Sequence, residues 1–482
     1  MELGNDFGNP HDLMLAEDHI VLKLKTAWPP DVEAPEGFTL GGDNGLLLVT
    51  NQKALVSASE SELLQHANVS KALFCGCAPF DSCDRYASVA SKLLRDAQEV
   101  HIVHNRNAVY KLVSMFPNAQ VIALPHDLGR HYIEFDVPHR DISAPLVERS
   151  QLRQLVGSTA DQREECLQIS RETTVALLRS CPDVCRIDSR WVVNCFTNPN
   201  NLLTPADRQR AKNIKQVIVV DKGLVPTTGL VLPLVAADVA LAAKVFPSLE
   251  TLQVFLGSQK ELAKISAFGQ LRSLAVAFGP SFINRDIGAQ LEQVLKNLPG
   301  LEELDLEHCG GIRLLTISKL CARLRSLRVA NCVGYMNDIP VDGNGFPYLE
   351  RVELDMQILK AVFDSLLFAT RNKLRIVRFD DDDLCLAFLH YCVQKGRHQP
   401  FPSLERLTLN TKESLSALKL HPEDMHDVLS ALPVLRHVDT DSYDLRLFFE
   451  NYCTPRGRVS LSWVGCVYCA AHSPDLFRVE GF

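Results

Sequence analysis

The chain has 482 residues, which is more than one compact hydrophobic core usually holds, so it should form several domains or one long array of repeats. Hydrophobic residues make up 46% and charged residues 22%, as in folded, water-soluble proteins. The net charge of −8 argues against nucleic acid as the partner, because phosphate binding requires a basic surface.

Targeting and membrane signals are not recognisable in the sequence. Residues 1–18 carry acidic side chains and no apolar core, unlike a secretory signal. The most apolar stretch, residues 229–246, is interrupted by Pro233, Asp238 and Lys244, so no membrane partner is expected. Fifteen cysteines occur singly, which together with the missing signal predicts reduced thiols in the cytoplasm or the nucleus.

Residues 1–95 have the least regular pattern. Alternating apolar residues predict a strand at 19–25 and a second strand at 46–49. Residues 60–73 are predicted to form a helix. We expect this region to be either an N-terminal cap of a repeat array or a divergent adaptor-binding region.

Residues 96–245 predict degenerate repeats, in which strands and helices alternate. The pattern indicates strands at 99–103 and 215–220 and a helix at 164–180. An inserted loop at about residues 125–160 interrupts this alternation.

Residues 246–455 contain eight copies of one short phrase. The first leucines of the copies are Leu249, Leu271, Leu301, Leu324, Leu349, Leu374, Leu404 and Leu435. They lie 22 to 31 residues apart, which accommodates one strand and one helix per unit. Because one unit cannot bury its own apolar face, the units must stack on one another. Residues 456–482 should then cap the last unit.

Two neighbouring copies are the most regular. They are Leu301, Leu304, Leu306 and Cys309, followed by Leu324, Leu327, Val329 and Cys332. In this pattern the chain resembles the cysteine-containing leucine-rich-repeat proteins of the F-box and ribonuclease-inhibitor-like type, although no F-box is recognisable. The resemblance implies an α/β solenoid with a curved parallel sheet on the concave side and helices on the convex side. It also implies substrate capture for a cullin-type ubiquitin ligase, with a ligase adaptor as a further partner.

The residues between the strand leucines should align in rows on the concave face, because alternate side chains of a strand point to opposite faces. The middle row reads Asp305, Arg328, Glu353, Arg378, Thr408 and Asp439. Charge alternates from Asp305 to Arg378, and neighbouring strands lie about 4.8 Å apart. We therefore expect lateral ion pairs within the middle row.

A second row, the acidic row, reads Glu307, Ala330, Asp355, Asp380, Asn410 and Asp441, and Asp381, Asp382 and Asp383 extend it at a loop. It contains acids and no base, and like charges this close are unfavourable unless water or a partner compensates them. The row should therefore either receive a basic segment of a protein partner or form a charged rim that maintains solubility. The first row, which is mixed in charge, reads Ser326, Arg351, Ile376, Arg406 and His437. From the three rows, the residues predicted to contact the partner are Glu303, Asp305, Glu307, Asp355, Asp380, Asp382, Arg351, Arg378, Arg406 and Asp441.

Catalytic residues and cofactors are not predicted. His139-Arg140-Asp141 is similar to the start of a kinase catalytic loop, but Leu146 occupies the position of the required asparagine. Zinc needs four ligands, and the cluster of Cys466, Cys469 and His472 offers three, so metal binding there stays open. The leading interpretation is a non-enzymatic module that binds a protein partner. The alternatives are a GTPase-regulating array and a structural scaffold without a ubiquitin link.

Overall fold

The computed structural model describes most of residues 18–461. Longer gaps lie at 42–46, 58–65, 77–83, 103–108, 126–150, 159–166, 198–202, 219–235, 412–419 and 453–459, and short ones at 51, 168, 170, 190, 280–281, 336–339, 342, 397, 422–423 and 441. The chain divides into two compact units. The first unit comprises Met1–Lys222 and Trp463–Phe482, and the second unit comprises Gly223–Ser462. Within the described ranges, no helix is both long enough and apolar enough to cross a bilayer.

The first unit begins with antiparallel strands. Strand β1 (Asp18–Leu24) lies between β3 (Leu47–Thr50) and β4 (Val69–Gly76), and β2 (Thr39–Gly41) pairs with β3. Strands β1 and β3 confirm the predicted strands at 19–25 and 46–49. The helix predicted at 60–73 is wrong from Val69 onward, because β4 hydrogen-bonds to β1 on one side and to the next strand on the other.

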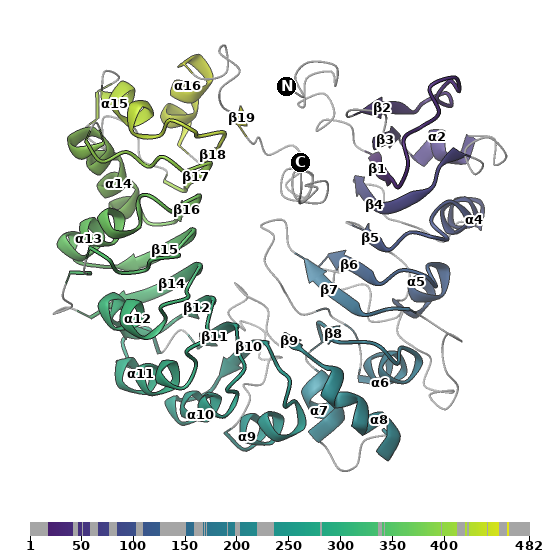
Figure 1. Cartoon of the computed structure of the whole chain (residues 1–482), viewed down its shortest axis with the longest axis horizontal. Coiled ribbons are helices and arrows are strands. Elements are labelled where there is room, and N and C mark those ends of the chain that lie inside the picture. The colour runs from purple at the N-terminus through teal and green to yellow at the C-terminus, as the bar shows by residue number, and fades with distance from the viewer. Residues whose placement is uncertain are drawn as a thin grey trace. The chain divides into compact units, whose positions relative to one another are not determined.

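The rest of the first unit is a parallel sheet with helices in its connections (Figure 1). Its strands are β5 (Glu99–Ile102), β6 (Val121–Pro125), β7 (Gln154–Ser158), β8 (Arg186–Ile187) and β9 (Gln216–Ile218). Its helices are α2 (Gln52–Ser57), α4 (Asp84–Leu93), α5 (Val109–Met115), α6 (Arg171–Ser180), α7 (Trp191–Thr197), α8 (Pro205–Gln209) and the 3₁₀ helix η3 (Arg210–Asn213). The loop predicted at 125–160 is wrong at β7, whose residues pair with β6 along its whole length.

The second unit is a parallel sheet whose strands follow one another in chain order. They are β10 (Thr251–Leu256), β11 (Ser273–Phe278), β12 (Glu303–Glu307), β13 (Gly310–Ile312), β14 (Ser326–Gly334), β15 (Arg351–Gln357), β16 (Ile376–Phe379), β17 (Arg406–Leu409), β18 (His437–Thr440) and β19 (Ser460–Leu461). Strand β14 pairs with β12 and, near its end, with the short strand β13. All eight phrases of the sequence supply a strand, so this prediction is confirmed.

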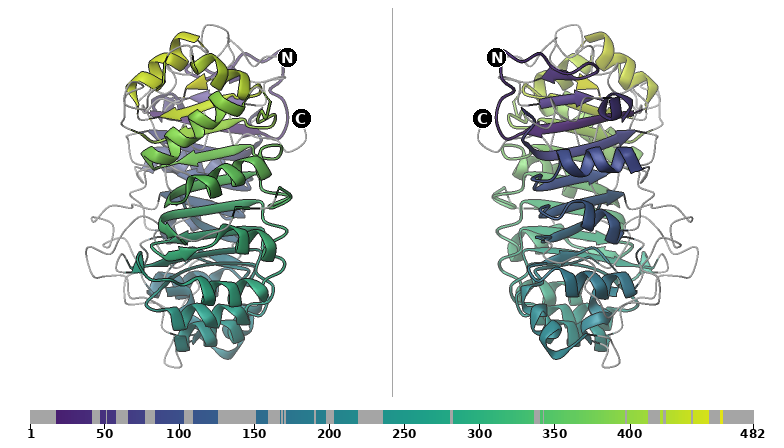
Figure 2. Two further views of the ribbon diagram at one scale, coloured as in Figure 1. Left: turned by 90° about the vertical axis from the view of Figure 1, so that its left-hand side faces the viewer. Right: turned by 90° about the vertical axis from the view of Figure 1, so that its right-hand side faces the viewer.

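Helices connect these strands and cover one face of the sheet (Figures 1 and 2). They are α9 (Ala236–Val245), α10 (Gln259–Lys264), the 3₁₀ helix η4 (Ile265–Ala267), α11 (Gly288–Lys296), α12 (Leu314–Leu320), α13 (Lys360–Thr370), α14 (Asp382–Lys395), α15 (Asp424–Ala431) and α16 (Tyr443–Tyr452). The core lies between helices and sheet, where Leu301, Leu304 and Leu306 are almost fully buried. Apolar side chains at the same positions of the other strands continue this core along the unit.

Candidate functional site

The face of the second unit's sheet opposite its helices, here called the open face, carries the predicted rows. Asp305 on β12 lies beside Arg328 on β14, and Arg328 lies beside Glu353 on β15. Glu353 in turn lies beside Arg378 on β16. This is the register from which the rows were predicted. The rows lie on this face because side chains alternate along each strand. The leucines point into the core, and the charged residues between them point to the open face.

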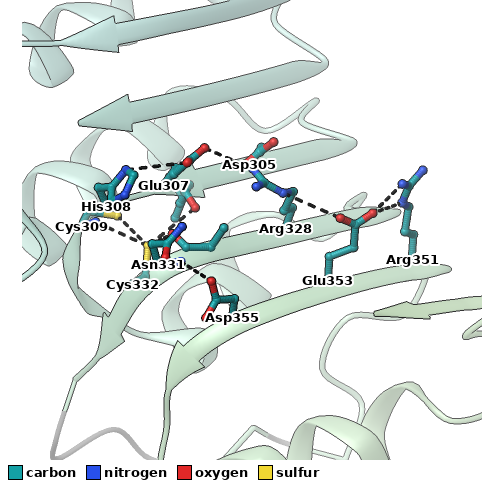
Figure 3. Close-up of polar contacts among 12 residues, drawn as sticks. Asp305, Glu307, His308, Cys309, Arg328, Asn331, Cys332, Arg351, Glu353 and Asp355 are labelled. Carbon is teal, nitrogen blue, oxygen red and sulfur yellow. Dashed lines mark hydrogen bonds and ion pairs between the residues drawn. The ribbon is translucent and has the colours of Figure 1, made fainter. Parts of the chain in front are cut away.

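Arg328 is the centre of a charged cluster on the open face (Figure 3). Its Nη1 atom lies 2.8 Å from Asp305 Oδ1 and 3.5 Å from Glu307 Oε2, and its Nε atom lies 3.7 Å from Glu353 Oε2. The side chain of Arg328 is only 11% exposed, and that of Glu307 only 4%. Burial alone would lower the pKa of Arg328, but the three carboxylates raise it above its usual value, so the guanidinium remains charged. The lateral pairing expected for the middle row is therefore present here.

Glu353 is held by two cations. Arg351 Nε donates a 2.6 Å hydrogen bond to Glu353 Oε1, in addition to the contact with Arg328. Burial acts to raise the pKa of Glu353, but Arg351 and Arg328 outweigh it and lower the pKa below its usual value. Arg351, which was placed in the first row, thus neutralises a residue of the middle row.

Asp380 is paired as well, which corrects the expectation of an uncompensated acidic row. Arg378 Nε lies 2.9 Å from both carboxylate oxygens of Asp380, and Asn410 Nδ2 donates to Asp380 Oδ1. Arg378 therefore pairs with a residue two positions further along the chain, in the neighbouring row. The side chain of arginine is long enough to reach an acid in a neighbouring row. The rows read from the sequence therefore do not predict which charged residues pair.

Asp382 does not extend the acidic row at a loop, and that prediction is wrong. Asp382 and Asp383 are exposed residues in the first turn of α14. Asp381 precedes them as the N-cap, and its Oδ1 atom accepts a 3.0 Å hydrogen bond from the Leu384 amide. Acidic side chains are favourable at this end of a helix because they interact with its free amides and dipole. These three aspartates therefore begin a helix.

Asp355 differs from the other acids of the row. It is half-buried on β15, and its Oδ2 atom accepts a 3.2 Å hydrogen bond from the Asn331 amide. Within the described ranges it forms no ion pair. Burial raises the pKa of Asp355, and the nearby charges of Asp380 and Asp381 raise it further. Arg328 lowers the pKa of Asp355 in part, but the surroundings of Asp355 still disfavour its charged form in the folded chain.

A bulge in β14 positions the Asn331 amide, which donates a hydrogen bond to Asp355. The pairing of β14 with β15 shifts between Ala330 and Cys332, so Asn331 forms a bulge with a φ angle of 50°. Asparagine tolerates this left-handed conformation better than most residues. Cys332 then points into the core, where its sulfur donates to the Ala330 carbonyl at 3.1 Å and lies 3.5 Å from the Cys309 sulfur.

The other predicted contact residues have separate positions. Glu303 is exposed at the start of β12 and accepts a 2.8 Å hydrogen bond from Ser273 Oγ. Arg406 lies on β17, with its Nε atom 4.0 Å from Asp439 Oδ2. Asp441 lies outside the described residues.

No family model matches the sequence, and no curated protein matches it. The second unit repeats a strand followed by a helix, and the apolar residues of the eight phrases are buried between the two. The chain has a leucine-rich-repeat fold.

Solved structures similar to this leucine-rich-repeat chain include an internalin of Listeria monocytogenes. It is 11% identical with a TM-score of 0.29, and the match covers 86% of this chain and 90% of the internalin. A leucine-rich-repeat protein of Leptospira interrogans is also 11% identical, with a TM-score of 0.28 and coverage of 82% and 90%. A complex of TLR13 with a single-stranded RNA is 14% identical, with a TM-score of 0.36 and coverage of 77% and 54%. These likenesses concern the fold alone.

Sequence reasoning missed a second set of charges, here called the charge ladder. It consists of the residues that follow the first leucine of every phrase, namely Glu250, Arg272, Glu302, Arg325, Glu350, Arg375, Glu405 and Arg436. Ion pairs join Arg272 to Glu302 at 3.7 Å, Arg325 to Glu350 at 3.3 Å and Arg375 to Glu405 at 3.0 Å. The strict alternation of sign in the sequence was the signal that could have revealed it.

The residues of the charge ladder directly precede the strands β10, β11, β12, β14, β15, β16, β17 and β18 in the chain. Backbone hydrogen bonds also connect its members, for example from the Arg325 amide to the Glu302 carbonyl at 2.7 Å. A hollow of about 330 Å³ adjoins it, lined in part by Glu250, Arg272 and Glu302. Its exposed ion pairs are each worth about 0–1 kcal/mol, so they favour correct alignment of the strands more than they stabilise them.

Metal binding finds no support among the described residues, where no group of three or more His, Cys, Asp or Glu side chains could hold an ion. The cluster of Cys466, Cys469 and His472 lies outside the described residues, as does His139-Arg140-Asp141.

Proposed function

We propose that this leucine-rich-repeat chain is a non-enzymatic protein-interaction module that binds a protein partner on the open face of its second unit. The observation that carries the proposal is the contrast between the Arg328 cluster and Asp355. Asp305, Arg328, Glu307 and Glu353 are fixed by mutual contacts, with side chains 4% to 13% exposed. Beside them, Asp355 retains a half-buried carboxylate without an ion pair in the described part of the chain.

A solubility role explains this arrangement less well. Charges that maintain solubility are exposed and surrounded by water, whereas the charges of the Arg328 cluster are nearly buried. Fixed charges favour recognition, since their side chains lose little conformational freedom when a partner binds. A carboxylate without an ion pair, such as Asp355, favours partners of opposite charge.

The test is affinity purification of the full chain from cells followed by mass spectrometry, comparing the wild type with Asp355→Lys. The matched control is Glu350→Lys, which makes the same charge change in the same repeat but on the charge ladder. We expect Asp355→Lys to lose partners that Glu350→Lys retains. Equal recovery by both variants would contradict the proposed face.

A narrower hypothesis is that the chain is a substrate receptor of a cullin-type ubiquitin ligase. Its support is the resemblance of the Cys309 and Cys332 repeats to those of F-box receptors, together with the buried positions of both thiols. The described part of the segment 60–94 contains β4, which belongs to the sheet, and helix α4, so the adaptor contact must be tested on the intact chain. A cullin and its adaptor should be recovered with the full chain. Recovery of other partners without them would contradict this hypothesis.

We also propose that the protein resides in the cytoplasm or the nucleus. Cys309, Cys321, Cys332, Cys385 and Cys392 are buried free thiols. Buried thiols behave as small hydrophobic side chains, which suits a reducing compartment. Fluorescence imaging of the tagged full chain tests the location, and a secreted product would contradict it.

A further inference from the structure

We infer that the last residues of the chain, Trp463–Phe482, here called the tail, dock as an internal ligand on the face of the first unit's sheet that the helices leave free. The tail belongs to the first unit, although β19 directly before it pairs with β18 of the second unit. Docking there differs from the cap of the last repeat that the sequence suggested. The inference does not depend on the proposed function, which concerns the second unit.

The first step is an apolar row on the face of the first unit opposite its helices. In the register of the sheet, Val21 on β1 lies beside Leu73 on β4, and Ala123 on β6 lies beside Val156 on β7. His101 on β5 lies between the two pairs. The residues that alternate with these five along the strands belong to the core on the helix side (Figure 1).

The second step is the burial of this apolar row. Leu73 is 0% exposed, Ala123 is 4% exposed and Val21 is 8% exposed, although no helix of the described ranges lies on their side of the sheet (Figure 1). A leucine on a bare sheet face keeps part of its side chain in water, because its strand neighbours contact only its flanks. The complete burial of Leu73 therefore indicates that another segment of the chain covers the row.

The third step is the fit of the tail to the apolar row. The row crosses five neighbouring strands, a distance of about 19 Å at about 4.8 Å per strand, which about six residues of extended chain can span. The tail is longer than this, and its large apolar residues are Trp463, Val464, Val467, Tyr468, Leu476, Phe477, Val479 and Phe482. Such residues gain free energy when they leave water for an apolar surface.

The fourth step is the charge beside the apolar row. Lys23 on β1 and Lys71 on β4 lie side by side in the register, one position along the same face from Val21 and Leu73. Lys71 Nζ lies 2.7 Å from Glu99 Oε2, and the other oxygen of Glu99 lies 2.6 Å from His101 Nε2. Lys23 forms no ion pair with the described residues. Burial and the charge of Lys71 lower its pKa, and Glu99 offsets this only in part.

Two acids of the tail, Asp475 and Glu480, can supply the missing negative charge. They enclose Leu476, Phe477 and Val479, so docking of these apolar residues on the row brings carboxylates to the lysines at its edge. Opposite charges beside an apolar contact fix the position and the direction of a bound segment. The tail thus matches the face of the first unit in both hydrophobicity and charge.

The experiment measures how fast chymotrypsin cleaves the tail of the full chain after Tyr468 and Phe477. A docked segment must leave the sheet before it is cleaved, so the rate reports the undocked fraction. The double substitution Lys23→Glu and Lys71→Glu should accelerate the cleavage about fivefold or more. The matched control, Arg325→Glu with Arg375→Glu, makes the same charge change on the charge ladder and should leave the rate unchanged.

Substitutions in the tail keep the test independent of how the first unit folds. Asp475→Lys with Glu480→Lys should accelerate the cleavage as well, and combining both pairs of substitutions should restore the slow rate. Each rate is divided by that of a synthetic peptide with the same tail sequence, which removes any effect on the protease itself. A wild-type tail cleaved as fast as its free peptide, or a combined variant that stays fast, would overturn this inference. The proposed function has its own test in Asp355→Lys and would stand in either case.

Discussion

Arg328 on β14 donates a 2.8 Å hydrogen bond to Asp305 on the neighbouring parallel strand β12, and this bond anchors the charged cluster of the open face. The same guanidinium faces Glu307 and Glu353, so one cation serves three carboxylates. The cluster therefore depends on Arg328 more than on any single acid, and removal of Arg328 is the sharpest test of its structural role.

Replacing Arg328 by methionine should destabilise the second unit by about 3–5 kcal/mol, because three nearly buried carboxylates would lose their common cation. Urea denaturation of the full chain measures the change. The control is Arg325→Met on the charge ladder, whose side chain is 58% exposed and whose loss should cost about 0–1 kcal/mol. Equal costs for both variants would show that the Arg328 cluster does not stabilise the sheet.

The charge ladder should respond to salt. Glu350 lies between Arg325 and Arg375 and is hydrogen-bonded to the backbones of both. Replacing Glu350 by arginine would place a third guanidinium beside these two. We expect a loss of about 1 kcal/mol or less at low ionic strength, and a smaller loss at about 1 M salt, where the Debye length is about 3 Å. Melting temperatures at the two salt concentrations measure it. A loss that does not depend on salt would point to a packing effect instead.

The aspartates at the start of α14 should separate stability from binding. Asp381→Ala removes the side chain that accepts a hydrogen bond from the Leu384 amide. Loss of such an N-cap lowers the free energy of unfolding by about 0.5–2 kcal/mol. Because this residue begins a helix, the variant should be less stable in urea denaturation and still recover the partners of the wild type. Loss of the partners with unchanged stability would return Asp381 to the binding surface.

The sequence predicted the second unit well because its apolar spacing is regular. Strands β12 and β14 follow from Leu304, Leu306, Leu327 and Val329, which share one core, and the parallel register then places Asp305 beside Arg328. Two core residues at the correct spacing are enough to fix both the strand and its facing row. The leucine-rich-repeat fold is accordingly the part of the prediction that the structure confirms.

Other features depend on interactions that spacing does not encode. Strand β8 has two residues, Arg186 and Ile187, and is too short to give a periodic signal. Val69 begins a strand because β1 and β5 flank it, which is a long-range effect. The pairing of Arg378 with Asp380 depends on the direction in which the long arginine side chain extends. The sequence does not show whether an arginine pairs with an acid in its own row or with one in the adjacent row.

Asp355 provides the last prediction, in which stability and binding have opposite signs. Its native pKa is raised, chiefly by burial, so the charged form is less favourable in the folded chain than in the unfolded chain. Above the native pKa the carboxylate therefore lowers the free energy of unfolding, and below the unfolded pKa of about 3.9 this effect is absent. Asp355→Asn keeps an acceptor for the Asn331 amide and removes the charge.

We therefore expect Asp355→Asn to be more stable than the wild type at pH 7, with the gain disappearing as the pH falls below about 4. Urea denaturation at several pH values measures the difference, with Glu350→Gln as the control for removal of an exposed charge. A residue that lowers stability and is needed for a partner is typical of a binding site, because such sites retain charges that folding alone does not favour. A variant that is less stable than the wild type at pH 7 would instead make Asp355 a structural residue that holds the bulge at Asn331.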